Sequence, residues 1–374
     1  MRLIELRQYL HKHPELSGEE YKTHDYLKTY LHDELNLDAI TVAKTGLVVV
    51  FDSGVEGVVT LFRGDIDGLP IVDDIDEPYK STREAVGHKC GHDGHTTIMV
   101  GLCERLKDSP PESGKVLILF QPAEETGEGA KKVLEDEFFQ SLQLDYAFAL
   151  HNIPGYPKGD ILWKYDIFSA SVISCSIDIK GATAHAATPW TGRNPSHLIA
   201  RIFDYTEDCN RETYNKDGLE VITPIFAQIG KTAYGISAGK GTVHFTLRAI
   251  DQQAMEALQK KFQSYVEEEA DKRNLELSWK WFEEFYANDN DREAVDVLKA
   301  AAKAIDMNLV HLHRPFRWGE DFGLINEVAS KGCMFGLGAG EDTPPLHDQA
   351  FDFPDDIIEP GVDIFFSIYK TMYA

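Results

Sequence analysis

Positive charge is scarce in this chain. Its 374 residues include 37 Lys and Arg against 62 Asp and Glu, so the formal net charge is −25. A protein that binds nucleic acid needs a basic face to displace counterions from phosphate, and an anionic membrane surface makes the same demand. The composition therefore predicts neither a nucleic-acid partner nor a membrane partner. The acidity identifies no ligand, because a large net charge mainly keeps a protein in solution.

Cysteine and long apolar runs are also scarce. Five widely separated cysteines form no disulfide framework. No stretch approaches the ~18 apolar residues that span a bilayer, and the N-terminus lacks the apolar core of a secretion signal. We therefore expect a cytoplasmic protein whose thiols are reduced and free to bind a metal. Hydrophobic residues still make up 43% of the chain, which argues against disorder.

The first part of the chain has the pattern of an α/β protein. Continuous apolar runs predict buried strands at 47–51, 58–62, 116–120 and 146–150. Helical patterns around 95–107 and 126–140 separate the later runs, which is typical of a mixed, largely parallel sheet. Near the N-terminus, Ser17-Gly18-Glu19-Glu20 has the pattern of a capping box and predicts the start of a helix.

The pattern changes after residue 168. Alternating strands and two helices follow in the order β-α-β-β-α-β, which is the arrangement of a ferredoxin-like sheet. Such a unit closes on itself, so we predict that 169–285 is a separate α+β domain. It would be inserted into a first domain made of 1–168 and 286–374, where helices and buried strands return.

One segment packs metal-binding side chains unusually densely. His88-Lys89-Cys90-Gly91-His92-Asp93-Gly94-His95 holds three imidazoles, a thiol and a carboxylate, with a predicted helix just after it. The spacing fits no structural zinc finger, but the cluster favours a metal site over chance.

Four further segments are weaker alone. Glu124 and Glu125 follow the strand at 116–120, His151 closes the strand at 146–150, and His347 follows a glycine-rich turn. The charged stretch Arg63 to Pro70 follows a strand and is most simply a polar turn. All four lie in the same predicted domain, so jointly they strengthen the case for one site. Adjacent carboxylates can divide the work of metal-assisted hydrolysis, one binding a metal and the other holding a water.

His185 stands apart, in a loop of small residues, Gly181 to Pro189, within the inserted domain. By composition alone it reads as an ordinary surface histidine.

Taken in order, these segments resemble the motifs of the metal-dependent amidohydrolase/aminoacylase family of metallopeptidases. The resemblance is to the branch of hippurate hydrolases, auxin–amino-acid conjugate hydrolases and N-acetyldiaminopimelate deacetylases. It runs from the His11-Lys-His13-Pro segment to Leu346-His347 and includes Gly319-Glu320-Asp321-Phe322, so it covers nearly the whole chain. It implies a zinc-peptidase-like catalytic domain with an inserted lid and dimerisation domain.

The resemblance also implies roles for individual residues. Two divalent ions would be bound by the following side chains: Cys90, His92, Glu125, His151 and His347. Glu124 would be the general base, and His185 would stabilise the oxyanion, often across a dimer in relatives. One of Asp65 and Asp67 would orient a ligand; we favour Asp65, although spacing does not separate the two. A thiolate ligand favours Zn, Ni, Co or Mn over Mg or Ca.

Two features depart from the family pattern. After the glutamate pair, relatives have a run of glycines, whereas this chain has Thr126-Gly127-Glu128-Gly129. Relatives also carry an Asn that contacts the substrate carboxylate, and here Gly235 stands in its place. Asn194 and Arg248 remain possible anchors for that carboxylate.

We therefore predict a metal-dependent amidohydrolase that cleaves N-acyl amino acids or related conjugates, acting as a homodimer through the inserted domain. One alternative is a dipeptidase or carboxypeptidase on the same scaffold. The other is a metal-binding interaction protein that has lost turnover.

Overall fold

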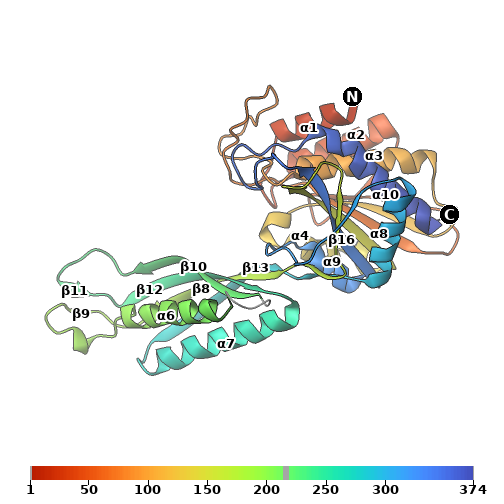
Figure 1. The fold of residues 1–374 in the computed structure, drawn as a ribbon. Coiled ribbons are helices and arrows are strands. Elements are labelled where there is room, and N and C mark those ends of the chain that lie inside the picture. The colour runs from red at the N-terminus through yellow and green to blue at the C-terminus, as the bar shows by residue number, and fades with distance from the viewer. Residues whose placement is uncertain (1, 214–218, 374) are drawn as a thin grey trace. The chain divides into compact units, whose positions relative to one another are not determined.

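The chain forms two compact units (Figure 1). The computed structural model describes residues 2–213 and 219–373. The first unit comprises the chain up to Phe168, Asn288–Pro315 and the chain from Glu320 onward. The second comprises Ser169–Ala287 and Phe316–Gly319. The second unit thus differs from the predicted insertion at 169–285 by two residues at its end and by the short return segment Phe316–Gly319.

The first unit is built on a mixed sheet, as the apolar runs predict. Four of its adjacent pairs are parallel: β4 with β3, β3 with β5, β5 with β16, and β6 with β15. The strand order is β1 (Ala39–Val42), β2 (Gly46–Asp52), β4 (Lys115–Gln121), β3 (Val59–Asp65), β5 (Tyr146–Pro154), β16 (Lys331–Gly340), β6 (Ile161–Trp163) and β15 (Leu309–His311). The central strands are buried nearly throughout, which explains their continuous apolar character.

Helices cover both faces of this sheet. Figure 1 shows α1, α3 and α10 on one face and α4 and α9 on the other. The helices are α1 (Arg2–Lys12), α2 (Tyr21–Leu35), α3 (His92–Asp108), α4 (Gly129–Glu135), α5 (Glu137–Gln140), α8 (Arg292–Ala304), α9 (Phe322–Val328) and α10 (Ile358–Tyr373). The fold is the predicted mixed α/β class. The helix predicted at 126–140 is broken into α4 and α5 at Asp136, whose side chain accepts a hydrogen bond from Phe138 N.

The predicted capping box at Ser17–Glu20 is wrong, although a helix does begin at Tyr21. Glu20, at the N-cap, makes no side-chain cap on α2, and the carboxylate of Glu15 instead accepts from the backbone N–H groups of Lys22 (2.7 Å) and Thr23 (2.9 Å). Ser17 Oγ instead donates to Asp67 Oδ2 (2.7 Å), and Glu20 accepts from the backbone N–H of Ala123 (2.9 Å). These long-range hydrogen bonds form in place of the local cap, and they hold the segment Ser17–Glu20 against Asp67 and Ala123.

The second unit has the predicted βαββαβ order. Its antiparallel sheet has the order β10 (Glu220–Ile229), β12 (Lys240–Ala249), β8 (Ser171–Lys180) and β13 (Glu276–Phe285). Helices α6 (Ser196–Thr213) and α7 (Gln252–Asp271) pack on it, because alternate residues of β8 and β12 point into a shared apolar core. A small ribbon of β9 (Ala184–His185) and β11 (Ile236–Ser237) carries His185.

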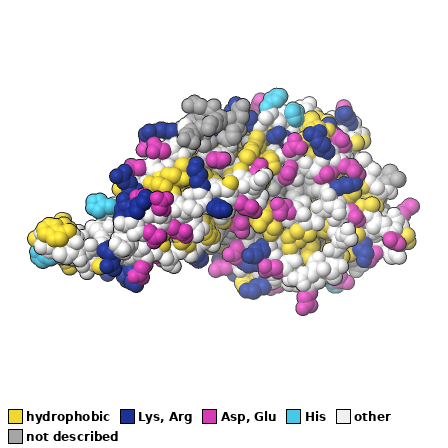
Figure 2. All heavy atoms as spheres, turned by 90° about the horizontal axis from the view of Figure 1, so that it is seen from below, with side chains coloured by type: hydrophobic (Ala, Val, Ile, Leu, Met, Phe, Trp, Pro, Cys, Tyr) yellow, Lys and Arg dark blue, Asp and Glu magenta, His cyan; other side chains and the backbone are white. Residues whose placement is uncertain are grey.

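The excess of acidic residues is dispersed on the face shown in Figure 2. Asp and Glu side chains lie there among Lys and Arg side chains and are not gathered into one patch. This agrees with the interpretation of the net charge as a solubility feature. Among the described residues, no helix is long and apolar enough to cross a membrane.

Candidate metal centre and active site

The candidate side chains lie at one edge of the first unit's sheet. Strands β4, β3, β5 and β16 are neighbours and run parallel, so their carboxyl ends meet at the same edge. Asp65 ends β3, Gln121 ends β4, His151 lies in β5, and His347 follows β16. The carboxyl edge of such a sheet is where ligands bind in open α/β folds.

Two turns with positive φ aim the remaining candidates. Gly91 has φ 101°, which lets the chain turn sharply between Cys90 and His92, the first residue of α3. Ala123 has φ 52° directly before Glu124, and the carboxylate of Glu20 holds its backbone N–H. A non-glycine residue in this region is strained and persists where surrounding contacts fix it.

The structure brings all five predicted ligands together. Their potential donor atoms lie within 4.8 Å of one another in overlapping groups: Cys90, His92 and His151; Cys90, Glu125 and His347; His92, Glu124 and Glu125. Since the groups share members, they form one connected cluster. His347 is the outer member, with half of its side chain exposed, whereas Cys90, His92 and His151 are buried.

Hydrogen bonds fix which nitrogen of each histidine faces the cluster. His92 Nδ1 donates to the carbonyl oxygen of Asp67 (3.0 Å) and to its Oδ1 (3.2 Å). His151 Nδ1 donates to the carbonyl oxygen of Asn152 (2.9 Å). Nδ1 therefore carries a proton in both rings, and Nε2 is the nitrogen that faces the cluster and would bind a cation. Outer hydrogen bonds of this kind are typical of metal-bound histidines.

Two buried polar atoms support the interpretation as a metal site. His92 Nε2 and Glu125 Oε1 have no hydrogen-bond partner, although both are shielded from water. They lie 3.7 Å apart, and His347 Nε2 lies 3.7 Å from the same carboxylate oxygen. Buried donors and acceptors without partners are costly, and a cation between them would satisfy both. The donor set of thiol, imidazole and carboxylate fits two divalent ions of the zinc type.

Asp67, not the favoured Asp65, orients the candidate ligand His92. Asp67 binds His92 Nδ1, while Asp65 Oδ1 accepts from His95 Nδ1 (2.7 Å). The sequence could not separate the two, because residues two apart on an extended segment face the same way. His95 in turn accepts the backbone N–H of Asn152 (3.2 Å), next to His151.

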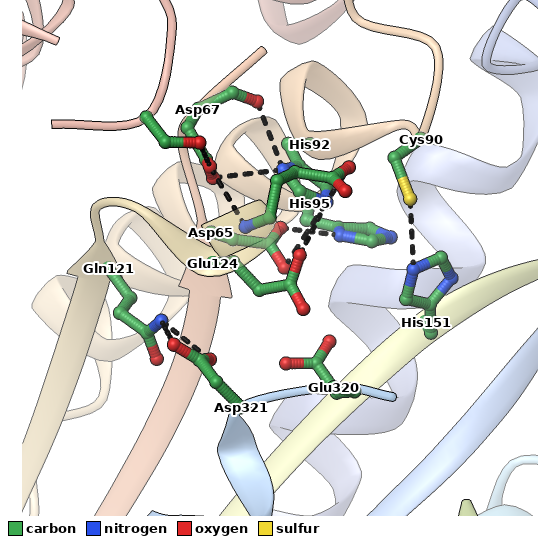
Figure 3. A network of polar contacts seen from close by, with 12 residues as sticks. Asp65, Asp67, Cys90, His92, His95, Gln121, Glu124, His151, Glu320 and Asp321 are labelled. Atoms are coloured by element: carbon green, nitrogen blue, oxygen red, sulfur yellow. Dashed lines mark hydrogen bonds and ion pairs between the residues drawn. The ribbon is translucent and has the colours of Figure 1, made fainter. Parts of the chain in front are cut away.

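Arg63 pairs with three buried carboxylates of the site. Its guanidinium donates to Asp65 Oδ2 (2.7 Å), Glu320 Oε1 (2.9 Å) and Asp321 Oδ1 (2.9 Å). Asp321 also accepts from the side chain of Gln121 (2.8 Å), the contact drawn at the lower left of Figure 3. The interpretation of Arg63 to Pro70 as a polar turn is thus wrong, because Arg63 and Asp65 lie in β3 and are buried.

Electrostatics show an excess of buried negative charge. Burial raises the pKa of Glu124 well above its usual value, and the carboxylates of Glu320 and Glu125 add to the effect. Burial likewise raises the pKa of Glu125 to about 8. Burial would lower the pKa of His92, but Asp65 and Asp67 outweigh it and raise that pKa to about 10. Carboxyl groups that resist ionisation in this way are stabilised when cations enter.

Several residues of the site carry no signal in the sequence that predicts their role. The resemblance implies that the segment Gly319 to Phe322 lines the cleft, and the carboxylate of Glu320 in this segment lies within 4.8 Å of those of Asp65 and Glu124. His95 was counted in the cluster but given no role. One feature of the sequence does predict buried partners. Arg63 directly follows the apolar run 58–62, and a charged side chain that continues a buried strand must have buried partners of opposite charge.

The remaining predicted residues belong to the second unit. His185 Nδ1 accepts the backbone N–H of Ala187 (3.0 Å), which places its proton on Nε2. A Cβ added at Gly235 would meet nothing within 4 Å, so the position is open to a side chain. Asn194 donates to Ser237 (3.1 Å), and Arg248 donates to the carbonyl oxygen of Arg317 (2.7 Å).

A metal-binding cluster at the carboxyl edge of a mixed sheet, with a further buried glutamate beside it, defines a metal-dependent hydrolase. Comparison with known families identifies which one: residues 61–371 match peptidase family M20/M25/M40, and the chain belongs to this family. It is a metal-dependent amidohydrolase that acts on carbon–nitrogen bonds.

Its relatives include deacetylases and a hydrolase of similar length. The chain is 31% identical over 369 residues to an N-acetyldiaminopimelate deacetylase of Lactococcus lactis, with 96% of each chain covered. It is 28% identical to a hippurate hydrolase of Campylobacter jejuni, covering 94% of this chain and 92% of the relative. Among solved structures, a dinuclear metal binding peptidase of Bacillus subtilis is 27% identical, with a TM-score of 0.82 over 100% of this chain and 98% of that one.

Proposed function

We propose that the protein hydrolyses the amide bond of N-acyl amino acids or related conjugates, with Glu124 as the general base. The observation that carries this proposal is the position of Glu124: its Oε2 lies 3.8 Å from His92 Nε2, beside the candidate ligands. A purely structural metal site has no use for a further carboxylate at its open side. The named activities of the relatives support the same substrate class.

The two bound ions would polarise the substrate carbonyl and make a water acidic near neutral pH. Glu124 would accept the proton of that water as its oxygen attacks the carbonyl carbon. The same carboxyl group would then give the proton to the leaving nitrogen as the C–N bond breaks, so that acid and amine are released. Cations bound beside Glu124 would favour its ionised form, which is the form that accepts a proton.

We assign the ions to Cys90, His92, Glu125, His151 and His347, with Asp67 orienting His92. Burial raises the pKa of the Cys90 thiol, so binding of a cation would release its proton. We propose Zn, Mn, Ni or Co as the native metal, because a thiolate disfavours Mg and Ca. The cytoplasm is the compartment proposed, because five widely separated cysteines form no disulfide framework, as is usual in a reducing setting.

The test is a substrate screen combined with metal analysis. We expect the metal-loaded protein to release amino acid from N-acetyl or N-benzoyl amino acids and to hold two ions per chain by mass spectrometry. Free-amine dipeptides in the same screen address the alternative, and preference for them would make the protein a dipeptidase or carboxypeptidase.

A protein that held metal but cleaved nothing in the screen would be an interaction protein instead. The feature that favours this second alternative is Gly235, because it replaces the Asn with which relatives bind the substrate carboxylate. The retained Glu124 favours an enzyme.

We further propose a homodimer formed through the second unit, in which His185 donates Nε2–H to the oxyanion in the partner's site. Strand β10 is an end strand of its sheet and exposes Ile225, Phe226 and Ile229. An exposed apolar edge of this kind is suited to pairing with another copy. Light scattering should give the mass of two chains.

Complementation tests the role of His185. E124Q and H185A should each be nearly inactive alone. When the two variants are combined and their subunits exchange, half of the dimers contain one chain of each variant. One of the two sites in such a dimer combines Glu124 of one chain with His185 of the other. About a quarter of the wild-type activity should therefore return. A monomeric mass, or no recovery in exchanged dimers, would contradict the arrangement.

A further inference from the structure

A group of buried charges lies next to the candidate ligands but contributes none of them. Helix α1 places Arg7 and His11 one turn apart on its buried side, and both side chains are fully shielded from water. Neither residue belongs to the stretch 61–371 that matches the family. Buried cationic side chains are rare unless they are paired, so the partners of Arg7 and His11 show which segments these two residues connect.

His11 bridges two carboxylates. Its Nδ1 lies 2.8 Å from Asp93 Oδ2, and its Nε2 lies 3.2 Å from Asp73 Oδ2. An ionised carboxylate only accepts hydrogen bonds, so both ring nitrogens must carry a proton. His11 is thus an imidazolium held between two aspartates. Burial would lower its pKa, but Asp73 and Asp93 raise it to about 9.

Both aspartates are tied to segments that carry the candidate ligands. Asp93 directly follows His92 in the first turn of α3. Asp73 forms an ion pair with Lys89, which directly precedes Cys90. The carbonyl oxygen of Lys89 accepts the backbone N–H of His347 (2.7 Å). The contacts of His11 therefore reach the backbone beside Cys90, His92 and His347.

Arg7 closes the same group from the other side. Its guanidinium donates to Asp352 (2.7 Å) and Asp355 (2.7 Å), in the segment that follows His347. It also lies 3.5 Å from Asp93. Lys89 Nζ donates to the carbonyl oxygen of Phe351 (2.8 Å). The loop of Cys90 and the loop of His347 are thus joined through ion pairs and not through apolar packing alone.

We propose that His11 is a positioning residue of the metal centre: as a cation between Asp73 and Asp93, it fixes the segments that present Cys90, His92 and His347. The inference rests on the proposed metal site, although His11 touches none of the ligands. A merely structural role would lower stability and leave the geometry of the metal site intact. Positioning predicts a change in metal affinity and in the spectrum of the bound ion.

The experiment compares metal binding by apoproteins. H11Q removes the charge and leaves an amide that can serve one aspartate. H13Q is the matched control, because His13 lies two residues on and is exposed. Zinc affinity is measured by competition with a chromophoric chelator, and the thiolate absorption of the cobalt-loaded protein reports the Cys90 bond. Thermal unfolding of the apoproteins reports stability separately.

We expect H11Q to bind zinc about 10-fold more weakly, the lower end of the effect of removing a direct partner of a metal ligand, because His11 acts through Asp73 and Asp93. Its cobalt spectrum should differ from the wild type, while H13Q should match it. An unchanged affinity and spectrum in folded H11Q would overturn the inference, whatever its melting temperature. Wild-type protein that bound no metal would overturn the proposed function itself, which is a distinguishable result.

A second variant covers the case in which H11Q does not fold. D73N keeps an oxygen that accepts from His11 Nε2 but removes one negative charge and weakens the tie to Lys89. It should also weaken zinc binding and alter the cobalt spectrum. If D73N binds zinc as the wild type does, or if neither variant folds, the group is structural and the inference fails.

Discussion

The variant E124Q is expected to lower kcat by about 10²- to 10⁴-fold, the range that general acid–base catalysis contributes. Glutamine has nearly the same shape but cannot accept the proton of the attacking water. The metal content should stay at the wild-type level, because we assign the ions to other side chains. Steady-state kinetics on the best substrate of the screen and metal analysis of the same preparation would measure both quantities.

E128Q is the control for this prediction. Glu128 lies four residues further along, and more than half of its side chain is exposed. Its replacement should leave both kcat and metal content unchanged. Loss of an ion in E124Q would contradict our assignment, since the Glu124 carboxylate lies within reach of His92 and Glu125 and would then be a ligand itself.

Much of the fold could be predicted because the relevant signals are local. Buried strands such as β4 are continuous apolar runs, and the strands of the second unit alternate with period two. The resemblance to the family motifs supplies the five candidate ligands. Among them His92 begins a helix, Glu125 and His347 follow strands, and His151 lies within β5. Neighbouring parallel strands then bring them to one edge of the sheet.

The contacts that were missed are long-range. Ser17 and Glu20 look like a local cap, but their partners Asp67 and Ala123 lie 50 and 103 residues away in the sequence. The choice between Asp65 and Asp67 likewise depends on where His92 and His95 lie on α3. No local pattern contains such information, because it arises only once helix and strand pack together.

The contacts of Arg63 are also long-range, and of the contacts that no local pattern predicts they are expected to contribute most to stability. Its side chain is about 1% exposed and donates to four groups, the carboxylates of Asp65, Glu320 and Asp321 and the amide oxygen of Gln121. Burying a guanidinium is costly, and only a full set of acceptors offsets that cost. Removing the cation leaves several buried carboxylates to repel one another at the same place.

R63M is therefore expected to lower the free energy of unfolding of the metal-free protein by about 3–5 kcal/mol, measured by urea denaturation. R63K should recover only part of the loss, because one ammonium cannot reproduce the fork of a guanidinium. R105M is the control, since Arg105 pairs with Glu359 and Asp363 on the surface, where such pairs contribute about 0–1 kcal/mol. Adding metal should reduce the deficit of R63M, because cations that enter the cluster neutralise the carboxylates that Arg63 no longer faces. Equal losses in R63M and R105M would show that the buried carboxyl groups do not depend on Arg63 for their charge balance.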